Sequence, residues 1–276
     1  MSQEIYWVVG PGTDVGKTTI ASAAISVLCE LGHKTIGFKP YSARKFVDVI
    51  DSGYPGYPKT ISRVAGLDGA KLATISNITS PEDIDLISPV VYICYPEYLN
   101  TLVVRAGSQK ARNAEFFKGD SAISLENRKD YKRILKDLEI GNWVDFQKTT
   151  LNFLDSPVIG GNKVEGCFQY LINSRDVDAV VCEGAGRFLP FWNELKLVNH
   201  VFFIGNNEIY FFRDVDLKLN LNANKLLPVT SLSNALKQKK SYKAFLPFSR
   251  SEKRDDVAME TMRRLLQISS DPAIFN

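Results

Sequence analysis

The stretch VVGPGTDVGKTTIASAAISVLCELG, residues 8–32, decides the fold. It begins at the end of an apolar run, residues 5–9, which is typical of a buried strand. A glycine-rich loop follows at residues 10–19, and beyond it apolar residues recur at helical spacing. KTIGFKP, residues 34–40, then indicates a second buried strand. The stretch predicts a β-α-β unit with parallel strands and the loop at their carboxyl edge, where ligands bind in such sheets.

The residue types of the loop favour phosphate as its ligand. Glycines let backbone amides turn inward, and the helix amino end adds partial positive charge. Lys17 would reach the β- and γ-phosphates, and the Thr18 hydroxyl would bind Mg²⁺. The pattern GxxxxGK[ST] requires glycine where this chain has Pro11, so Gly10 begins a longer variant. A glycine turn before a surface lysine is the alternative. The residues predicted to hold a nucleotide are Gly12, Thr13, Asp14, Val15, Gly16, Lys17, Thr18 and Thr19.

A second motif, VDAVVCEGAG at residues 177–186, predicts another strand of the same sheet. A β-branched run ends in Glu183, as in a Walker B strand, and Gly-Ala-Gly then lets the chain turn sharply. Glu183 would lie beside Thr18 on the magnesium. The small residues after it would let a substrate approach the γ-phosphate.

These motifs resemble those of dethiobiotin synthetase, whose pattern is a GTDTxVGKT loop followed by YKP and, later, EGAGG. The loop from Thr13 to Thr18 matches it except at Asp14, which is a variable position, and Lys39-Pro40 matches the second strand end. Pro11 and Gly12 depart from the family, as does Arg187 after EGAG. The absence of lysine at position 12 argues against the partitioning and metal-cluster ATPases, which carry a second lysine there.

The resemblance implies a set of site residues. Lys17 and Lys39 would be catalytic, and Lys39 would also hold a carbamate. Magnesium would lie on Thr18, Asp68 and Glu183, where Asp68 starts a helix in GLDGAKLATIS, residues 66–76. Capping that helix is an equally good role for Asp68, and Asp48 and Asp51 are competing carboxylates. The residues expected to contact substrate are Lys39, Ser42, Gly184, Ala185 and Gly186.

The fold class that the pattern predicts is α/β, a three-layer P-loop NTPase fold with a mostly parallel central sheet, as one domain over residues 1–276. Residues 42–61 are rich in turn formers and predict a loop. After residue 190 the family pattern fades, and residues 198–219 predict a β-hairpin with its turn at 205–208. Helices are predicted at 127–139, 143–154, 164–174, 231–238 and 252–268, and a strand at 243–248.

Composition limits the partners. The 34 basic and 31 acidic residues leave a formal charge of +3, which is too weak to argue for nucleic acid or a membrane surface. The first residues lack the features of a secretion signal and indicate a cytoplasmic protein. The four cysteines stand apart without metal-ligand spacing, and only two histidines are available. A small-molecule amine or carboxylate is the expected substrate, ATP and Mg²⁺ the expected cofactors, and a homodimer the state that the resemblance implies.

Three functions remain open from the sequence. The resemblance implies an ATP-dependent ligase that phosphorylates a carbamate or carboxylate before amine attack, as in biotin biosynthesis. Cobyrinic acid amide synthases share the glycine loop, but too little chain remains for their glutaminase. The SPH and LGxxNH elements of dethiobiotin synthetase have no counterpart here. A regulatory or assembly ATPase that has lost the substrate pocket is therefore the alternative.

Overall fold

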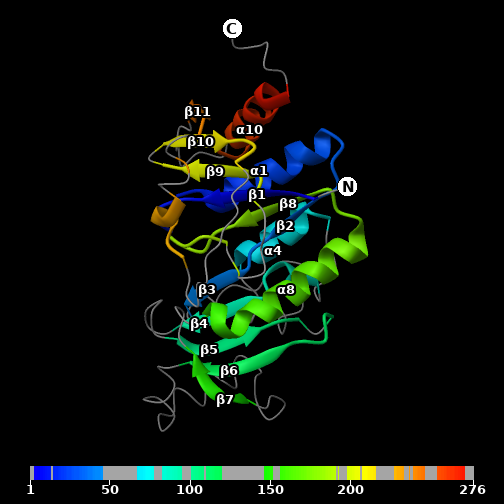
Figure 1. Cartoon of the computed structure of the whole chain (residues 1–276), viewed down its shortest axis with the longest axis vertical. Helices are drawn as coiled ribbons and strands as arrows, with labels where there is room; N and C mark the ends of the chain where they lie inside the picture. The colour runs from blue at the N-terminus through cyan, green and yellow to red at the C-terminus, as the bar shows by residue number, and fades with distance from the viewer. Residues whose placement is uncertain are drawn as a thin grey trace.

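The computed structural model describes most of the chain, and its strands form two sheets (Figure 1). The six-stranded sheet lies in the upper part of the view and the five-stranded sheet in the lower part. The residues described are 3–13, 15–45, 67–77, 83–94, 101–108, 110–119, 146–151, 156–190, 192, 198–205, 207–215, 227–232, 236, 239–245 and 254–270.

The six-stranded sheet is mixed but mostly parallel, as predicted. Its order is β11-β10-β9-β1-β8-β2, and β1, β2, β8 and β9 run parallel to one another. The predicted hairpin is confirmed, because β10 pairs antiparallel with both β9 and β11. Apart from Glu4 and Glu183, β1 and β8 consist of buried, mainly apolar residues, which explains why both strands lie inside the sheet. The strands are β1 (Glu4–Val9), β2 (Thr35–Phe38), β8 (Ala179–Glu183), β9 (His200–Ile204), β10 (Glu208–Phe212) and β11 (Ser241–Phe245).

Helices lie on both faces of this sheet. On one face α1 (Lys17–Glu30) contacts α4 (Leu67–Ile75) and α10 (Arg254–Ser270). On the other face α8 (Ser156–Arg175) places Phe168 against Phe38 of β2, with ring centroids 5.4 Å apart. The indole of Trp192 packs on both rings. Because successive strand residues point to opposite faces, Phe38 faces α8 and its neighbour Gly37 faces α1.

Replacing Gly37 with alanine is expected to destabilise the protein by about 1–3 kcal/mol, the usual cost of overpacking a core. A Cβ at this position would lie 2.8 Å from Leu72 Cβ and 2.9 Å from Ile25 Cδ1. Urea unfolding measures the difference. Gly205→Ala is the matched control, since its Cβ would make only ordinary contacts. Equal stabilities for the two variants would contradict this account of the helix-sheet packing.

The five-stranded sheet is the largest departure from the predictions. Its order is β3-β4-β5-β6-β7, with β3-β4 and β6-β7 parallel and the two central pairings antiparallel. α8 contacts β4 and β5, and short α5 (Ile84–Ile87) also contacts α8. The strands are β3 (Tyr41–Lys45), β4 (Val90–Cys94), β5 (Thr101–Ala106), β6 (Glu115–Gly119) and β7 (Phe146–Leu151).

Two predictions are wrong in this region. The predicted helix at 143–154 contains β7, and the predicted loop at 42–61 begins inside β3. Both strands are short, and their pairing with a neighbouring strand outweighs local propensity. The predicted helix at 127–139 and the rest of the 42–61 segment lie outside the described residues.

The C-terminal elements follow the predicted order. α10 overlaps the helix predicted at 252–268, β11 begins two residues before the strand predicted at 243–248, and η3 (Val229–Leu232), a 3₁₀ turn, overlaps the start of the helix predicted at 231–238. α10 packs on α1 through residues at helical spacing, including Ala258, Met262 and Leu265. None of the helices in the described ranges has the length and apolar character needed to cross a membrane.

Candidate functional site

The predicted strand-loop-helix unit is present, and the loop follows β1 directly. α1 begins at Lys17 after Gly16, which has a φ of 91° that side-chain-bearing residues rarely adopt. The first hydrogen bond within the helix runs from the Ile20 N–H to the Gly16 carbonyl, 3.0 Å. The preceding amides of the first turn therefore have no carbonyl within the helix to bind. This turn carries no acidic side chain that would repel an anion.

Strand register explains why the two sequence motifs meet. β8 lies between β1 and β2, and Glu183 at its end pairs with Val8. On the other side Cys182 pairs with Phe38, so the next residue along β2 is brought beside Glu183. That residue is Lys39. The carboxyl ends of three parallel strands thus converge next to the amino end of α1.

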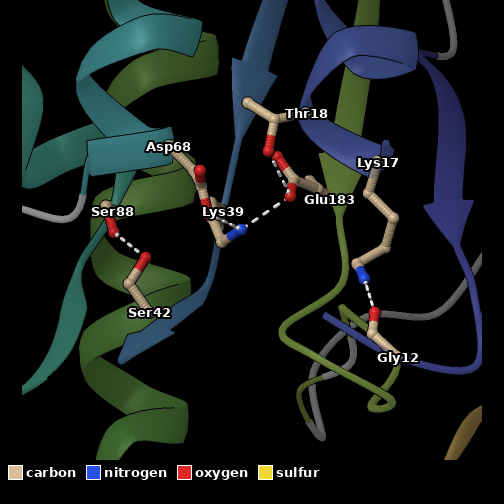
Figure 2. A network of polar contacts seen from close by, with 8 residues as sticks. All are labelled: Gly12, Lys17, Thr18, Lys39, Ser42, Asp68, Ser88 and Glu183. Carbon is tan, nitrogen blue, oxygen red and sulfur yellow. Dashed lines mark hydrogen bonds and ion pairs between the residues drawn. The ribbon is translucent and has the colours of Figure 1, made fainter. Parts of the chain in front are cut away.

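Lys39 connects two carboxylates at this point (Figure 2). Its ammonium lies 2.6 Å from Glu183 Oε1 and 2.5 Å from Asp68 Oδ2. The Lys39 side chain is 5% exposed and that of Glu183 1%, so their contact is shielded from water. Its backbone N–H donates to the Ile87 carbonyl, 2.8 Å away, which fixes the main chain where it leaves the first sheet.

Thr18 joins the same network from the helix. Its hydroxyl donates to Glu183 Oε1 over 2.9 Å, so this oxygen accepts from both Thr18 and Lys39. The other oxygen, Glu183 Oε2, is buried and has no hydrogen-bond partner among the residues that the structure describes. Asp68 enters from the first turn of α4. The three residues predicted to hold magnesium therefore come together, although they arise from separate parts of the chain.

The pKa values of the three ionisable groups in this network are shifted by burial and by their mutual charges. Burial opposes ionisation of Glu183 and outweighs the attraction of Lys39, so the pKa of this carboxyl is raised. Burial also acts against Asp68, but Lys39 outweighs it there and the pKa of Asp68 is lowered. For Lys39, burial is outweighed by the two carboxylates, and its pKa is raised. Burial thus disfavours the ionised form of Glu183 even beside Lys39.

Lys17 lies on the other side of Glu183 and turns back over the loop. Its ammonium donates to the Gly12 carbonyl, and the side chain is buried (Figure 2). Val15 packs against the core within the same loop. Thr19 is buried in α1 and Thr13 is exposed. Asp14 lies outside the described residues, and so do Asp48 and Asp51.

The small residues after Glu183 form the expected turn. The Phe188 N–H donates to the Ala185 carbonyl, 2.9 Å away, and Gly186 has a φ of 54°. A Cβ at Gly184 would lie 2.4 Å from the Phe188 carbonyl oxygen, so the turn has no room for a larger residue. A Cβ at Gly186 would contact the Thr13 methyl at 3.7 Å. The turn therefore lies against the glycine loop.

Ser42 is close to Lys39 in the chain but is engaged elsewhere. Its hydroxyl lies 2.9 Å from that of Ser88, and both residues are buried (Figure 2). Sequence reasoning missed Ser88, which carries no motif. Its position is set by a close approach of α4, because a Cβ at Gly69 would lie only 2.5 Å from Ser88 Cβ. The pair fixes β3 relative to the segment before β4.

The donor set suits a hard cation such as magnesium. Two carboxylates and one hydroxyl offer only oxygen, and Mg²⁺ commonly takes one or two carboxylates and completes its shell with water and phosphate oxygens. Nowhere in the described ranges do three or more His, Cys, Asp or Glu side chains gather in a way that could hold a metal by themselves. A cation here would complete its shell with water or with the oxygens of a second ligand.

A scan against models of protein families finds no match to this chain. A search of curated proteins finds no similar sequence.

Proposed function

We propose that this chain is an ATP- and Mg²⁺-dependent ligase that resembles dethiobiotin synthetase and has a P-loop NTPase fold. The observation that carries the proposal is the convergence of Thr18, Lys39 and Glu183 beside the glycine loop, with Asp68 on the same network. Two strand ends and a helix amino end supply the oxygens and ammonium groups that phosphoryl transfer requires. The nucleotide would lie along the loop from Gly12 to Thr19.

The chemistry would proceed in two displacements. An oxygen of a carbamate or carboxylate attacks the γ-phosphorus and ADP leaves, and an amine then attacks the acyl carbon and expels phosphate. Lys17 and Lys39 would hold the negative charge of the transferring group. When bound, Mg²⁺ supplies further charge neutralisation on the phosphate oxygens. Thr18, Asp68 and Glu183 would hold that ion, and Lys39, Gly184, Ala185 and Gly186 would contact the substrate.

Binding of Mg·ATP is the first test. At a nucleotide concentration about 100 times Kd, the free energy of unfolding is expected to rise by about 2.7 kcal/mol. Calorimetric titration and thermal unfolding measure it. AMP is the matched control, since it lacks the phosphates that the loop and Lys17 would hold, and it should protect far less. The absence of both heat and thermal protection with Mg·ATP would reject the proposal.

The second test concerns the substrate. With 7,8-diaminopelargonate, bicarbonate and ATP, a dethiobiotin synthetase releases ADP, phosphate and a cyclic urea. An ATP-binding preparation that forms no such product would exclude that version of the ligase while leaving another amine or carboxylate open.

One observation favours the alternative, a regulatory or assembly ATPase without the substrate pocket. Ser42, which the resemblance assigns to the substrate, instead contacts Ser88 inside the protein. Such an ATPase would hydrolyse ATP slowly and would form a stable complex with a partner protein. Strong stimulation of hydrolysis by a small amine would exclude it.

A further inference from the structure

The ammonium of Lys39 lies between two carboxylates from separate elements, Asp68 in α4 and Glu183 at the end of β8, and the Thr18 hydroxyl of α1 binds one of them. Asp68 Oδ2 and Glu183 Oε1 are 2.5 and 2.6 Å from it, and Thr18 Oγ1 is 2.9 Å from the same Glu183 oxygen. Figure 2 shows the ammonium between the two carboxylates. These are the three residues that would hold magnesium under the proposed function. The position between them is therefore already occupied by a cation that the protein itself supplies.

One carboxylate oxygen of the site is not neutralised by contact with Lys39. Glu183 Oε2 is buried without a hydrogen-bond partner in the described part of the chain, and the residue is 1% exposed. A buried carboxylate oxygen without a donor is costly, because it has lost water and gained nothing in return. A single ammonium on one oxygen leaves this cost in place. A small dication between the carboxylates would relieve it.

We propose that Lys39 is a resident counter-ion that exchanges with a divalent cation at Thr18, Asp68 and Glu183. This inference rests on the proposed function, since it concerns the same carboxylates. In the protein without metal, Lys39 neutralises them. When a dication enters, the ammonium leaves the carboxylates and becomes free to pair with phosphate or substrate oxygens.

The exchange explains why metal and nucleotide would bind together. A dication alone must compete with a buried ammonium that two carboxylates hold, so it binds weakly. A nucleotide supplies phosphate oxygens that complete the shell of the metal, and its negative charge accepts the displaced ammonium. Lys39 would thus reach the reacting group only after the metal-nucleotide complex has entered. Binding of the metal-nucleotide complex would thus be the event that makes the Lys39 ammonium available to phosphate or substrate oxygens.

The test measures binding of Mn²⁺ alone, without nucleotide, by electron paramagnetic resonance or calorimetry. The wild-type protein is expected to bind it weakly. Lys39→Met, which removes the competing ammonium, is expected to bind Mn²⁺ at least about tenfold more tightly, because both carboxylates then lack a counter-ion. Mn²⁺ should also raise the melting temperature of Lys39→Met more than that of the wild type. Equal or weaker Mn²⁺ binding by the variant would overturn the exchange.

Two controls separate the exchange from general effects of removing a lysine. Lys110→Met removes the ammonium that pairs with Asp83 outside this site, and it should gain no affinity for Mn²⁺. Adding Glu183→Gln to Lys39→Met should abolish the gain. If Lys39→Met does not fold, Lys39→Gln keeps a neutral donor and should still bind Mn²⁺ more tightly than the wild type. Tighter Mn²⁺ binding by Lys110→Met would overturn the exchange, because the gain would not be specific to Lys39. Tighter Mn²⁺ binding that persists in the Lys39→Met, Glu183→Gln double variant would also overturn it, because the metal would then bind somewhere other than Glu183.

The outcome is distinguishable from failure of the proposed function. If the wild type binds Mg·ATP but Lys39→Met gains no Mn²⁺ affinity, the exchange falls and the nucleotide site stands. If Lys39→Met gains Mn²⁺ affinity but the wild type does not bind Mg·ATP, the cation site stands without the nucleotide.

Discussion

Replacing Lys17 with alanine is expected to weaken binding of Mg·ATP roughly 100-fold, equivalent to about 3 kcal/mol, the range found when one partner of a buried charge pair is truncated. The side chain lies buried at the amino end of α1, and its ammonium covers the loop by donating to Gly12. Bound phosphate would replace that neutral carbonyl with a charged acceptor, which makes a stronger hydrogen bond. Calorimetric titration of the purified variant gives the change in Kd.

The control for this variant is Lys34→Ala. Lys34 pairs with Asp176 at an exposed position outside the site, so the same change there should leave nucleotide affinity unaltered. Far-ultraviolet circular dichroism checks that both variants keep the secondary structure of the wild type. An unchanged Kd for Lys17→Ala would remove the glycine loop from the proposed function, whatever else the protein binds.

Replacing Lys39 with methionine is expected to reduce the free energy of unfolding by about 3–5 kcal/mol at pH values where Glu183 is ionised, the usual cost of leaving a buried charge without its partner. Glu183 keeps its burial but loses the ammonium 2.6 Å away. The pKa of Glu183 is already raised by burial, and loss of Lys39 raises it further. Urea unfolding of wild type and variant measures the difference.

The pH dependence of this effect has a definite sign. A carboxyl whose pKa is higher in the folded than in the unfolded protein favours folding when protonated and opposes it when ionised. The deficit of Lys39→Met should therefore be largest above the raised pKa of Glu183 and should shrink as the pH falls through it. Adding Glu183→Gln removes the ionisable group and should restore most of the stability lost at pH values where Glu183 is ionised. A deficit that is independent of pH and survives in the double variant would show that lost packing, not charge, causes it.

The sequence predicted those parts of the fold in which the local apolar pattern already favours the conformation that the segment adopts in the sheet or helix. β1, α1, β2 and β8 each have an apolar pattern of the right period, and glycines mark the turns between them. Because parallel strands align their carboxyl ends, the sequence alone predicts that the strand ending in Glu183 lies near Thr18. The 2.9 Å hydrogen bond between these two residues agrees with that expectation.

The five-stranded sheet could not be predicted in the same way. The sequence of β3, YSARK, has two adjacent charges and little apolar alternation, and β7, FQKTTL, has a composition compatible with either helix or strand. Their strand conformation comes from pairing with β4 and β6, which are apolar or aromatic at several positions. Pairing between distant segments is a tertiary effect that a local window does not contain.

The candidate site shows the same division. Lys17, Thr18 and Glu183 stand out because they occupy motifs. Lys39 and Asp68 were assigned through resemblance, and the structure adds what resemblance did not supply, namely that one ammonium contacts both carboxylates. Ser88 carried no local signal, since its contact with Ser42 exists only after β3 has paired with β4.

The short crossing from β2 to β3 has a mechanical consequence. Only Lys39 and Pro40 separate the last residue of one sheet from the first residue of the other, and the ring of Pro40 removes one backbone rotation. A linker this short has almost no slack to absorb a tilt of the lower sheet. A tilt of the five-stranded sheet would therefore move the main chain of Lys39, and with it the position of the Lys39 ammonium. The site is thereby sensitive to forces on a part of the molecule that contributes none of its carboxylates.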